Sequence, residues 1–257
     1  MKLLNGFIVS DVDGTLIYKN QHLNKAGLKK MLALSKKKQI PFAVASGRTY
    51  TELQKIFKGF ENDLIFICFN GALCVCGGNV LFSHPIDRQH IRSFFDNFSR
   101  SSDTCAIEFC GMSKSFMFSD FYSVLAKERA KFGENLKIIQ NFDQIDEKIY
   151  KICLFKNRSQ KIFEQEGLYI SYFSDNLCEF VRENVSKYFS VEELCSSISV
   201  PMNKVTAFGD SENDRTLLEN AGVSYTTYCA EKGIFKLTKL HTRDCIGTIT
   251  RLLHENF

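Results

Sequence analysis

Near its N-terminus the chain reads Phe7-Ile8-Val9-Ser10-Asp11-Val12-Asp13-Gly14-Thr15-Leu16, an apolar run followed at once by two aspartates. A short continuous apolar run is typical of a strand buried on both faces of a parallel sheet. Side chains two residues apart on an extended chain point to the same side, so the carboxylates of Asp11 and Asp13 are expected to converge where the strand ends. Gly14 permits the sharp turn that brings backbone N–H groups toward a ligand.

The rest of residues 1–83 and residues 187–257 alternate helices with apolar strands in the same way. Near-continuous apolar strands that alternate with helices indicate an α/β fold whose parallel sheet is covered on both faces. We expect helices at 24–38, 51–57, 191–197 and 214–220, and strands at 41–45, 64–69, 204–208 and 222–225.

Polar residues follow four of the predicted strands at the point where each strand ends. They are Asp11, Ser46, Asn70 and Asp210. The carboxyl ends of parallel strands meet at one edge of the sheet, and ligands of open α/β sheets bind at that edge. The sequence therefore predicts a binding site there.

Residues 84–186 have a different pattern and are expected to form an inserted α+β domain with an antiparallel sheet. Gly77-Gly78 and Pro85 mark the entry to this segment, and Glu183-Asn184-Val185-Ser186 marks its exit. The predicted elements are helices at 87–98, 122–132 and 159–166 and strands at 104–110, 115–119, 150–155, 169–174 and 177–182. Residues 1–83 and 187–257 would then form the core domain, and 84–186 an inserted second domain.

Charge and composition indicate an ordinary globular protein and disfavour a dedicated nucleic-acid binder. The 257 residues carry 33 basic and 29 acidic side chains, mixed along the chain, for a net charge of +4. A nucleic-acid binder usually shows a clustered basic face, so we expect no nucleic-acid partner. We expect a monomer or a weak homo-oligomer.

The ten cysteines include no C-x-x-C pair, which disfavours zinc ribbons and thioredoxin-like sites. Most of them lie in apolar runs, where a free cysteine behaves as a small hydrophobe. Residues 64–86 lack charged side chains, but Asn70-Gly71, Gly77-Gly78 and Pro85 divide them into pieces too short to span a membrane. With no recognisable targeting segment, we expect a reduced, cytoplasmic protein that does not bind membranes.

A second acidic group, Gly209-Asp210-Ser211-Glu212-Asn213-Asp214, follows the predicted strand at 204–208. If this strand neighbours the first one, Asp11, Asp13, Asp210 and Asp214 share a small volume. Like charges about 4 Å apart repel by about 4 kcal/mol per pair at an effective dielectric constant of 20. A cation or strongly raised pKa values must relieve this repulsion, and hard oxygen donors favour Mg²⁺.

Calcium loops of the EF-hand type are excluded, because they need Gly at position 6 and Glu at position 12. Counted from Asp11 these positions hold Leu16 and His22, and counted from Asp210 they hold Arg215 and Ala221.

A phosphate group near these carboxylates would need hydrogen-bond donors and positive charge. Ser46 and the Gly47 amide, at the end of the second strand, can supply donors. Lys187, just before the C-terminal α/β segment, can supply the cation.

The ordered set of motifs resembles the haloacid dehalogenase superfamily. The set comprises Asp11-x-Asp13-Gly14-Thr15, Ser46-Gly47-Arg48, Lys187 and Gly209-Asp210-x-x-Asn213-Asp214. Asn70-Gly71-Ala72 and Val185-Ser186-Lys187 are most similar to its Cof-type phosphatases. The resemblance implies a Mg²⁺-dependent enzyme with a Rossmann-like core and a large α/β cap. Three features depart from the family pattern: Tyr188 stands where members usually have Gly, the loop 224–230 differs, and Arg215-Thr216 replaces a more apolar helix start.

The resemblance also implies residue roles. Asp11 would be the nucleophile that forms an aspartyl-phosphate, and Asp13 the general acid and then the general base. The Asp11 and Asp210 carboxylates and the Asp13 carbonyl would bind Mg²⁺. Asn213 and Asp214 would support the metal, and Ser46 and Lys187 would hold the phosphoryl oxygens.

The expected function is hydrolysis of a phosphate monoester of a small metabolite, such as a sugar phosphate. Two alternatives remain. One is a phosphosugar mutase, which would form the same aspartyl-phosphate. The other is a non-catalytic protein that binds a phosphorylated metabolite. A binding protein would be expected to lack Asp11 or Asp13, and both are present.

Overall fold

The computed structural model describes residues 6–18, 22–121 and 135–255. Contacts between residues divide the chain into two compact units. The first comprises Met1–Gly47, Leu53–Phe82 and Ser186–Phe257, and the second comprises Arg48–Glu52 and Ser83–Val185. The sequence had suggested boundaries one residue further along the chain and had left 48–52 in the first unit.

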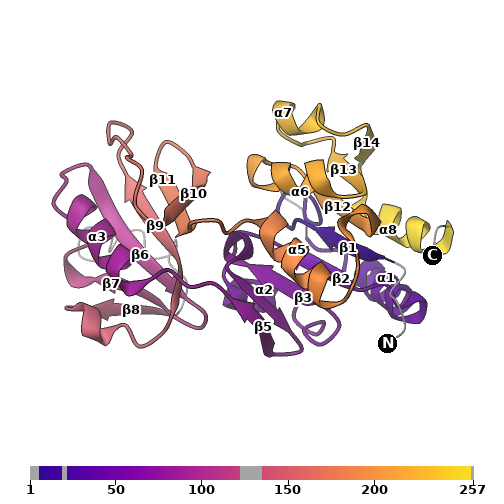
Figure 1. Ribbon diagram of the computed structural model, residues 1–257, viewed down its shortest axis with the longest axis horizontal. Helices are drawn as coiled ribbons and strands as arrows, with labels where there is room; N and C mark the ends of the chain where they lie inside the picture. Colours follow the sequence, from indigo (N-terminus) through magenta and orange to yellow (C-terminus); the bar gives the residue numbers. More distant parts are fainter. Residues whose placement is uncertain (1–5, 19–21, 122–134, 256–257) are drawn as a thin grey trace. The chain divides into compact units, whose positions relative to one another are not determined.

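The first unit contains an eight-stranded sheet in the order β14-β13-β12-β1-β2-β3-β4-β5 (Figure 1). Central strand β1 pairs in parallel with β12 and β2, with Ser10 opposite Phe208 and Val44. All of β1 is buried, so both faces of the sheet are covered as predicted. The strands are β1 (Phe7–Ser10), β2 (Phe42–Ala45), β3 (Ile65–Cys68), β4 (Leu73–Cys76), β5 (Asn79–Ser83), β12 (Val205–Gly209), β13 (Val223–Thr227) and β14 (Leu240–Thr242).

One edge of this sheet departs from parallel pairing. Strand β4 runs antiparallel to β3, and Gly77 and Gly78 connect it to β5. Both glycines have positive φ, 55° and 79°, which a two-residue hairpin turn requires. Gly77 and Gly78, which divide the uncharged segment 64–86, therefore form a hairpin turn.

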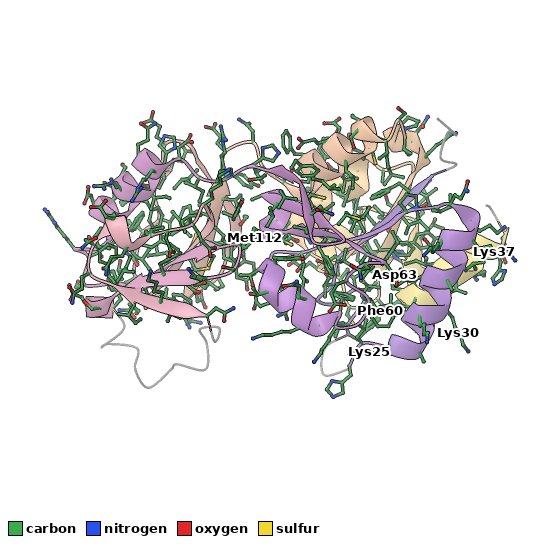
Figure 2. All side chains as sticks on the ribbon, turned by 90° about the horizontal axis from the view of Figure 1, so that it is seen from below. Lys25, Lys30, Lys37, Phe60, Asp63 and Met112 are labelled. Atoms are coloured by element: carbon green, nitrogen blue, oxygen red, sulfur yellow. The ribbon has the colours of Figure 1, made fainter. Side chains whose placement is uncertain are left out.

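The described α-helices of the first unit are α1 (Lys25–Lys38), α5 (Lys187–Ser197), α6 (Arg215–Asn220), α7 (Lys232–Phe235) and α8 (Cys245–Glu255). Helix α2 (Tyr50–Ile56) begins in the segment assigned to the second unit and ends in the first. The side chain of Asn24 caps α1 by accepting a hydrogen bond from the Gly27 N–H at 2.9 Å. Figure 2 shows Lys25, Lys30 and Lys37 along the solvent side of this helix, where all three are exposed. Helix α1 packs beside α8, and no helix in the described part of the chain is long and apolar enough to cross a bilayer.

The second unit contains a six-stranded sheet in the order β10-β11-β9-β6-β7-β8 and the helix α3 (Arg88–Phe98). The strands are β6 (Thr104–Gly111), β7 (Ser115–Phe118), β8 (Leu136–Ile139), β9 (Ile149–Lys156), β10 (Leu168–Phe173) and β11 (Leu177–Arg182). The pairing is antiparallel except between β7 and β8, which run parallel. The sequence missed β8, and the prediction of a purely antiparallel sheet was wrong there. A parallel pair needs a crossover of a dozen or more residues, and 119–135 supply that length.

The predicted helix at 159–166 was also wrong, because the segment forms turns and irregular chain. Ser159 donates a hydrogen bond to Asp103, and Gln160 donates one to Thr104. These bonds hold the segment against the loop before β6, and a helix this short is marginal without packing. The predicted helix at 122–132 lies outside the described residues.

The two faces of the second sheet differ in chemistry. Ile107, Phe109, Ile152 and Leu154 join Phe94 of α3 in an apolar core with almost no exposed surface. Alternate residues of the same strands point to the other face, which is polar.

Candidate active site

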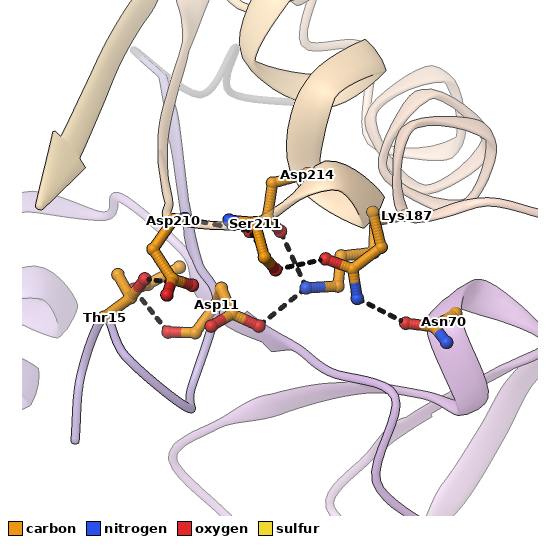
Figure 3. A network of polar contacts seen from close by, with 9 residues as sticks. Asp11, Thr15, Asn70, Lys187, Asp210, Ser211 and Asp214 are labelled. Carbon is orange, nitrogen blue, oxygen red and sulfur yellow. Dashed lines mark hydrogen bonds and ion pairs between the residues drawn. The ribbon is translucent and has the colours of Figure 1, made fainter. Parts of the chain in front are cut away.

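The buried ammonium of Lys187 joins two carboxylates at the carboxyl end of the first sheet (Figure 3). Its Nζ atom lies 2.6 Å from Asp11 Oδ1 and 2.7 Å from Asp214 Oδ1, and the side chain has no exposed surface. Lys187 is the first residue of α5, four residues earlier than the predicted start, because Ser186 caps the helix by accepting a hydrogen bond from the Phe189 N–H. The capped helix start fixes where this cation lies.

Parallel pairing brings Asp11 and Asp210 together. Asp11 follows β1 and donates its N–H to the Phe208 carbonyl at 2.9 Å, and Asp210 follows β12. Carboxylate oxygens of Asp11, Asp210 and Asp214 lie within 4.8 Å of one another. Residues about 200 positions apart in the chain thus form one acidic cluster.

Asp214 organises the loop that carries Asp210. Its Oδ2 atom accepts hydrogen bonds from the backbone N–H groups of Asp210 and Ser211, at 3.0 and 3.2 Å. Because its Oδ1 atom holds Lys187, this fully buried carboxylate connects the loop to the cation. Asp214 therefore positions both neighbours.

Burial and mutual repulsion make the cluster electrostatically costly. Burial raises the pKa of Asp11 well above its usual range despite the opposing Lys187 cation, and Asp214 and Asp210 add to the rise. Burial and Asp214 raise the pKa of Asp210 to about 6. Burial disfavours the charged form of Lys187, but the carboxylates outweigh this and raise its pKa above the usual range. One ammonium thus faces three carboxylates.

The cluster fits a hard divalent cation. All of its donor atoms are carboxylate oxygens, the ligands that Mg²⁺ prefers. Among the described residues, no hydrogen-bond partner reaches the buried Oδ2 atom of Asp11. From the described residues, the Asp210 carboxylate accepts one hydrogen bond, a long one of 3.4 Å from Thr15 Oγ1. The Asp210 carboxylate therefore keeps lone pairs for a metal ion, and Asp11 Oδ2 keeps lone pairs for a metal ion or an electrophile.

Gly14 is required beside this cluster, and we predict that Gly14→Ala removes most of the metal affinity. Its φ is +84°, and an added Cβ would lie 2.1 Å from Asp210 Oδ2. The substitution must displace Asp210 and strain the turn, which costs on the order of 1 kcal/mol or more. Calorimetric Mg²⁺ titration checks this. Gly59→Ala, at φ +92° with open space around the glycine, is the control for backbone strain alone.

Ser46 and Gly47, two of the predicted phosphate-binding residues, lie beside Asn70, which accepts a hydrogen bond from Asn213. Ser46 is buried after β2, and its carbonyl accepts the Asn70 N–H at 2.9 Å. A Cβ on Gly47 would lie 3.0 Å from Asn70 Nδ2, and Asn70 Oδ1 accepts a hydrogen bond from Asn213 at 2.9 Å. Asn70 thus joins the loop after β2 to the loop of Asp210.

The sequence placed Asn70 at this edge of the sheet but assigned it no role in the site. It adopts a left-handed conformation, φ 55°, which asparagine tolerates better than most residues, and Gly71 follows at φ +113°. Within the described residues, nothing hydrogen-bonds the buried Nδ2 atom of Asn70. Asn-Gly directly after a buried strand marks such a turn.

Asp13 and Tyr188 lie apart from the buried cluster. Asp13 is exposed, two residues after Asp11, and its carboxylate is outside the group of mutually close oxygens found in the described chain. Tyr188 donates a hydrogen bond to Glu192 along α5. Lys187 keeps its contacts with Asp11 and Asp214, although Tyr188 stands where the family usually has Gly.

Comparison with known proteins identifies the family of this chain. The sequence profile of haloacid dehalogenase-like hydrolases matches residues 8–244. The 5-amino-6-(5-phospho-D-ribitylamino)uracil phosphatase YbjI of Escherichia coli K12 is 22% identical over 242 residues, which cover 90% of this chain and 88% of that protein.

Solved structures share the fold. SMU.1108c of Streptococcus mutans UA159 superposes with a TM-score of 0.83 at 19% identity, covering 97% of this chain and 99% of that one. The subclass IIB sugar phosphatase BT4131 superposes with a TM-score of 0.75 at 14% identity, covering 97% and 98%. The profile match spans nearly the whole chain, so this protein belongs to the haloacid dehalogenase-like hydrolases.

Proposed function

We propose that this protein is a Mg²⁺-dependent phosphatase that hydrolyses phosphate monoesters of small metabolites through a phosphoryl group on Asp11. One observation carries the proposal: Lys187 holds one oxygen of Asp11, and no described residue hydrogen-bonds the other, buried oxygen. A carboxylate fixed on one side and unpaired on the other is suited to attack phosphorus.

The residues act in two steps. Asp11 Oδ2 forms a bond to phosphorus as the bond to the leaving oxygen breaks, and Asp13 gives that oxygen its proton. Asp13 then takes a proton from water, which attacks phosphorus and releases Asp11 and inorganic phosphate. Bound Mg²⁺, held by Asp11, Asp210 and the Asp13 carbonyl, would offset the negative charge of the phosphoryl group.

The other predicted residues position the phosphoryl group. Lys187 supplies a fixed positive charge, Ser46 and the Gly47 amide supply hydrogen bonds, and Asp214 and Asn213 keep the Asp210 loop in place. Alignment and charge stabilisation are the main tasks of a phosphoryl-transfer enzyme.

The proposed substrate class is small phosphorylated metabolites, sugar phosphates among them. One relative is named for a phosphorylated ribitylaminouracil, and one structural neighbour is titled a sugar phosphatase. We assign the second unit the role of a cap that selects the leaving group and excludes water.

Phosphate release from p-nitrophenyl phosphate tests the proposal. We expect turnover with Mg²⁺, loss of turnover after EDTA treatment, and recovery when excess Mg²⁺ is added back, because the acidic cluster needs a cation to accept a phosphate dianion. A mutase would isomerise a sugar phosphate without release, and a binding protein would bind phosphate without turnover. Either result contradicts the proposal.

The affinity for Mg²⁺ should fall as the pH is lowered. The raised pKa of Asp210, about 6, means that this group is largely ionised at pH 7.5 and largely protonated at pH 5. A protonated carboxyl binds Mg²⁺ poorly, so the calorimetric Kd should increase across this interval. A Kd that stays constant between these pH values would contradict this prediction.

A further inference from the structure

The polar face of the second sheet carries a cluster of ionisable groups that the proposed phosphatase does not use. Glu108 and Cys110 on β6 and Cys153 on β9 are all less than 10% exposed. Glu108 lies directly opposite Cys153, and Cys153 lies opposite Glu179 of β11. Their side chains therefore point to the same face, away from the phenylalanine-rich core.

The spacing of these groups matches a metal centre. The two sulfur atoms of Cys110 and Cys153 are 3.9 Å apart. A tetrahedral centre with Zn–S bonds of about 2.3 Å separates two sulfur ligands by about 3.8 Å. A carboxylate oxygen of Glu108 and both sulfurs lie within 4.8 Å of one another. Three ligand atoms are thus already near the positions that a tetrahedral ion requires.

A fourth ligand position is also available. Glu179 Oε1 lies 3.9 Å from the sulfur of Cys153 and 2.8 Å from the ammonium of Lys151. Either the Glu179 carboxylate or a water molecule can therefore be the fourth ligand. Both complete the coordination of zinc.

The charge balance permits an ion. Lys151 pairs with Glu179 and also acts on Glu108, so a cation and two carboxylates lie near the two thiols. Burial raises the pKa of Glu108 and, together with Cys110, that of Cys153. Exchange of the two thiol protons for one divalent ion leaves the net charge unchanged, so binding adds no buried charge.

We propose that Glu108, Cys110 and Cys153 bind a thiophilic divalent cation of the zinc class, with water or Glu179 as the fourth ligand. Thiolate ligands select such ions over Mg²⁺, which prefers oxygen. The site lies within the second unit and shares no residue with the Asp11 cluster. The metal-site proposal can therefore be tested independently of the phosphatase proposal.

Cobalt substitution of the full-length protein tests the site. The reduced, EDTA-treated chain is titrated with Co²⁺, and we expect a thiolate-to-cobalt charge-transfer band that saturates at one equivalent and disappears when Zn²⁺ is added. Asp11→Asn should keep the band, because carboxylate-bound cobalt in the first unit gives no such absorption.

Matched variants assign the ligands. Cys110→Ala and Cys153→Ala should abolish the band, and Glu108→Gln should weaken cobalt binding at least about tenfold. Cys178→Ala removes an equally buried thiol from the apolar core of the same sheet and should leave the band unchanged. Circular dichroism identifies any variant that fails to fold.

If the variants do not fold, measurements on the wild-type chain alone test the proposed metal site. Zn²⁺ binding should release about two protons per ion in weakly buffered solution. Absence of the charge-transfer band, or thiols that form a disulfide instead of binding cobalt, would overturn the proposal and leave two packed cysteines.

Discussion

Asp11→Asn should reduce phosphate release by at least about 10⁴-fold while the protein stays folded. The amide cannot attack phosphorus as a carboxylate does, yet it has nearly the same shape. Its oxygen can still accept the hydrogen bond that Lys187 now gives to Asp11 Oδ1. The rate of p-nitrophenol release and the circular dichroism spectrum measure the two parts of this prediction.

Asp63→Asn is the matched control for Asp11→Asn. Asp63 is exposed and precedes β3, at the end of the strand opposite the one that leads to the site. This variant should keep the wild-type rate. Asp11→Asn activity within a few-fold of the wild-type rate would remove Asp11 from the proposed chemistry.

Lys187→Met should destabilise the protein by about 3–5 kcal/mol, the usual cost of removing one partner from a buried ion pair. The lysine side chain has no exposed surface and holds both Asp11 and Asp214. Without it, three close carboxylates must share protons or repel one another. Urea unfolding monitored by circular dichroism in the absence of Mg²⁺ measures the change.

Two further variants separate this effect from loss of a lysine in general. Lys36→Met, in the exposed last turn of α1, should change the free energy of unfolding by less than about 0.5 kcal/mol. Lys187→Met with Asp214→Asn should be more stable than Lys187→Met alone, because one carboxylate charge is gone. Equal stabilities of Lys187→Met and the double variant would contradict this prediction.

The elements that hold the acidic cluster were predictable because their signals are local. The apolar run at 7–10 and the aspartate after it locate β1 and its carboxyl end. A second run at 205–208 followed by Gly209-Asp210 locates β12. Parallel pairing then puts both aspartates at one edge, a result that follows from sheet geometry alone.

Other features depend on tertiary contacts that leave little local signal. Asn70 contributes through its contact with Asn213, far away in the chain. Strand β8 is short, and it pairs with β7 after a long crossover. The segment 159–166 has helical composition, but its side chains bond to 103–104.

The sulfur cluster of the second sheet shows the same limit. Spacing rules find zinc ligands that are close in sequence, such as C-x-x-C pairs. Cys110 and Cys153 are 43 residues apart and meet only because β6 and β9 pair. The sequence therefore predicted that most of the cysteines pack as small hydrophobes.

The central claim is that Asp11 carries the phosphoryl group during turnover. Acid quenching of single turnovers at successive times, followed by peptide mapping, tests it most directly in the wild-type chain and in Asp13→Asn. The predicted result is a hydroxylamine-sensitive phosphoryl group on the peptide containing Asp11, longer-lived in Asp13→Asn because water is no longer activated. Phosphate release with no phosphoryl group on Asp11 at any quench time, in either protein, would contradict it.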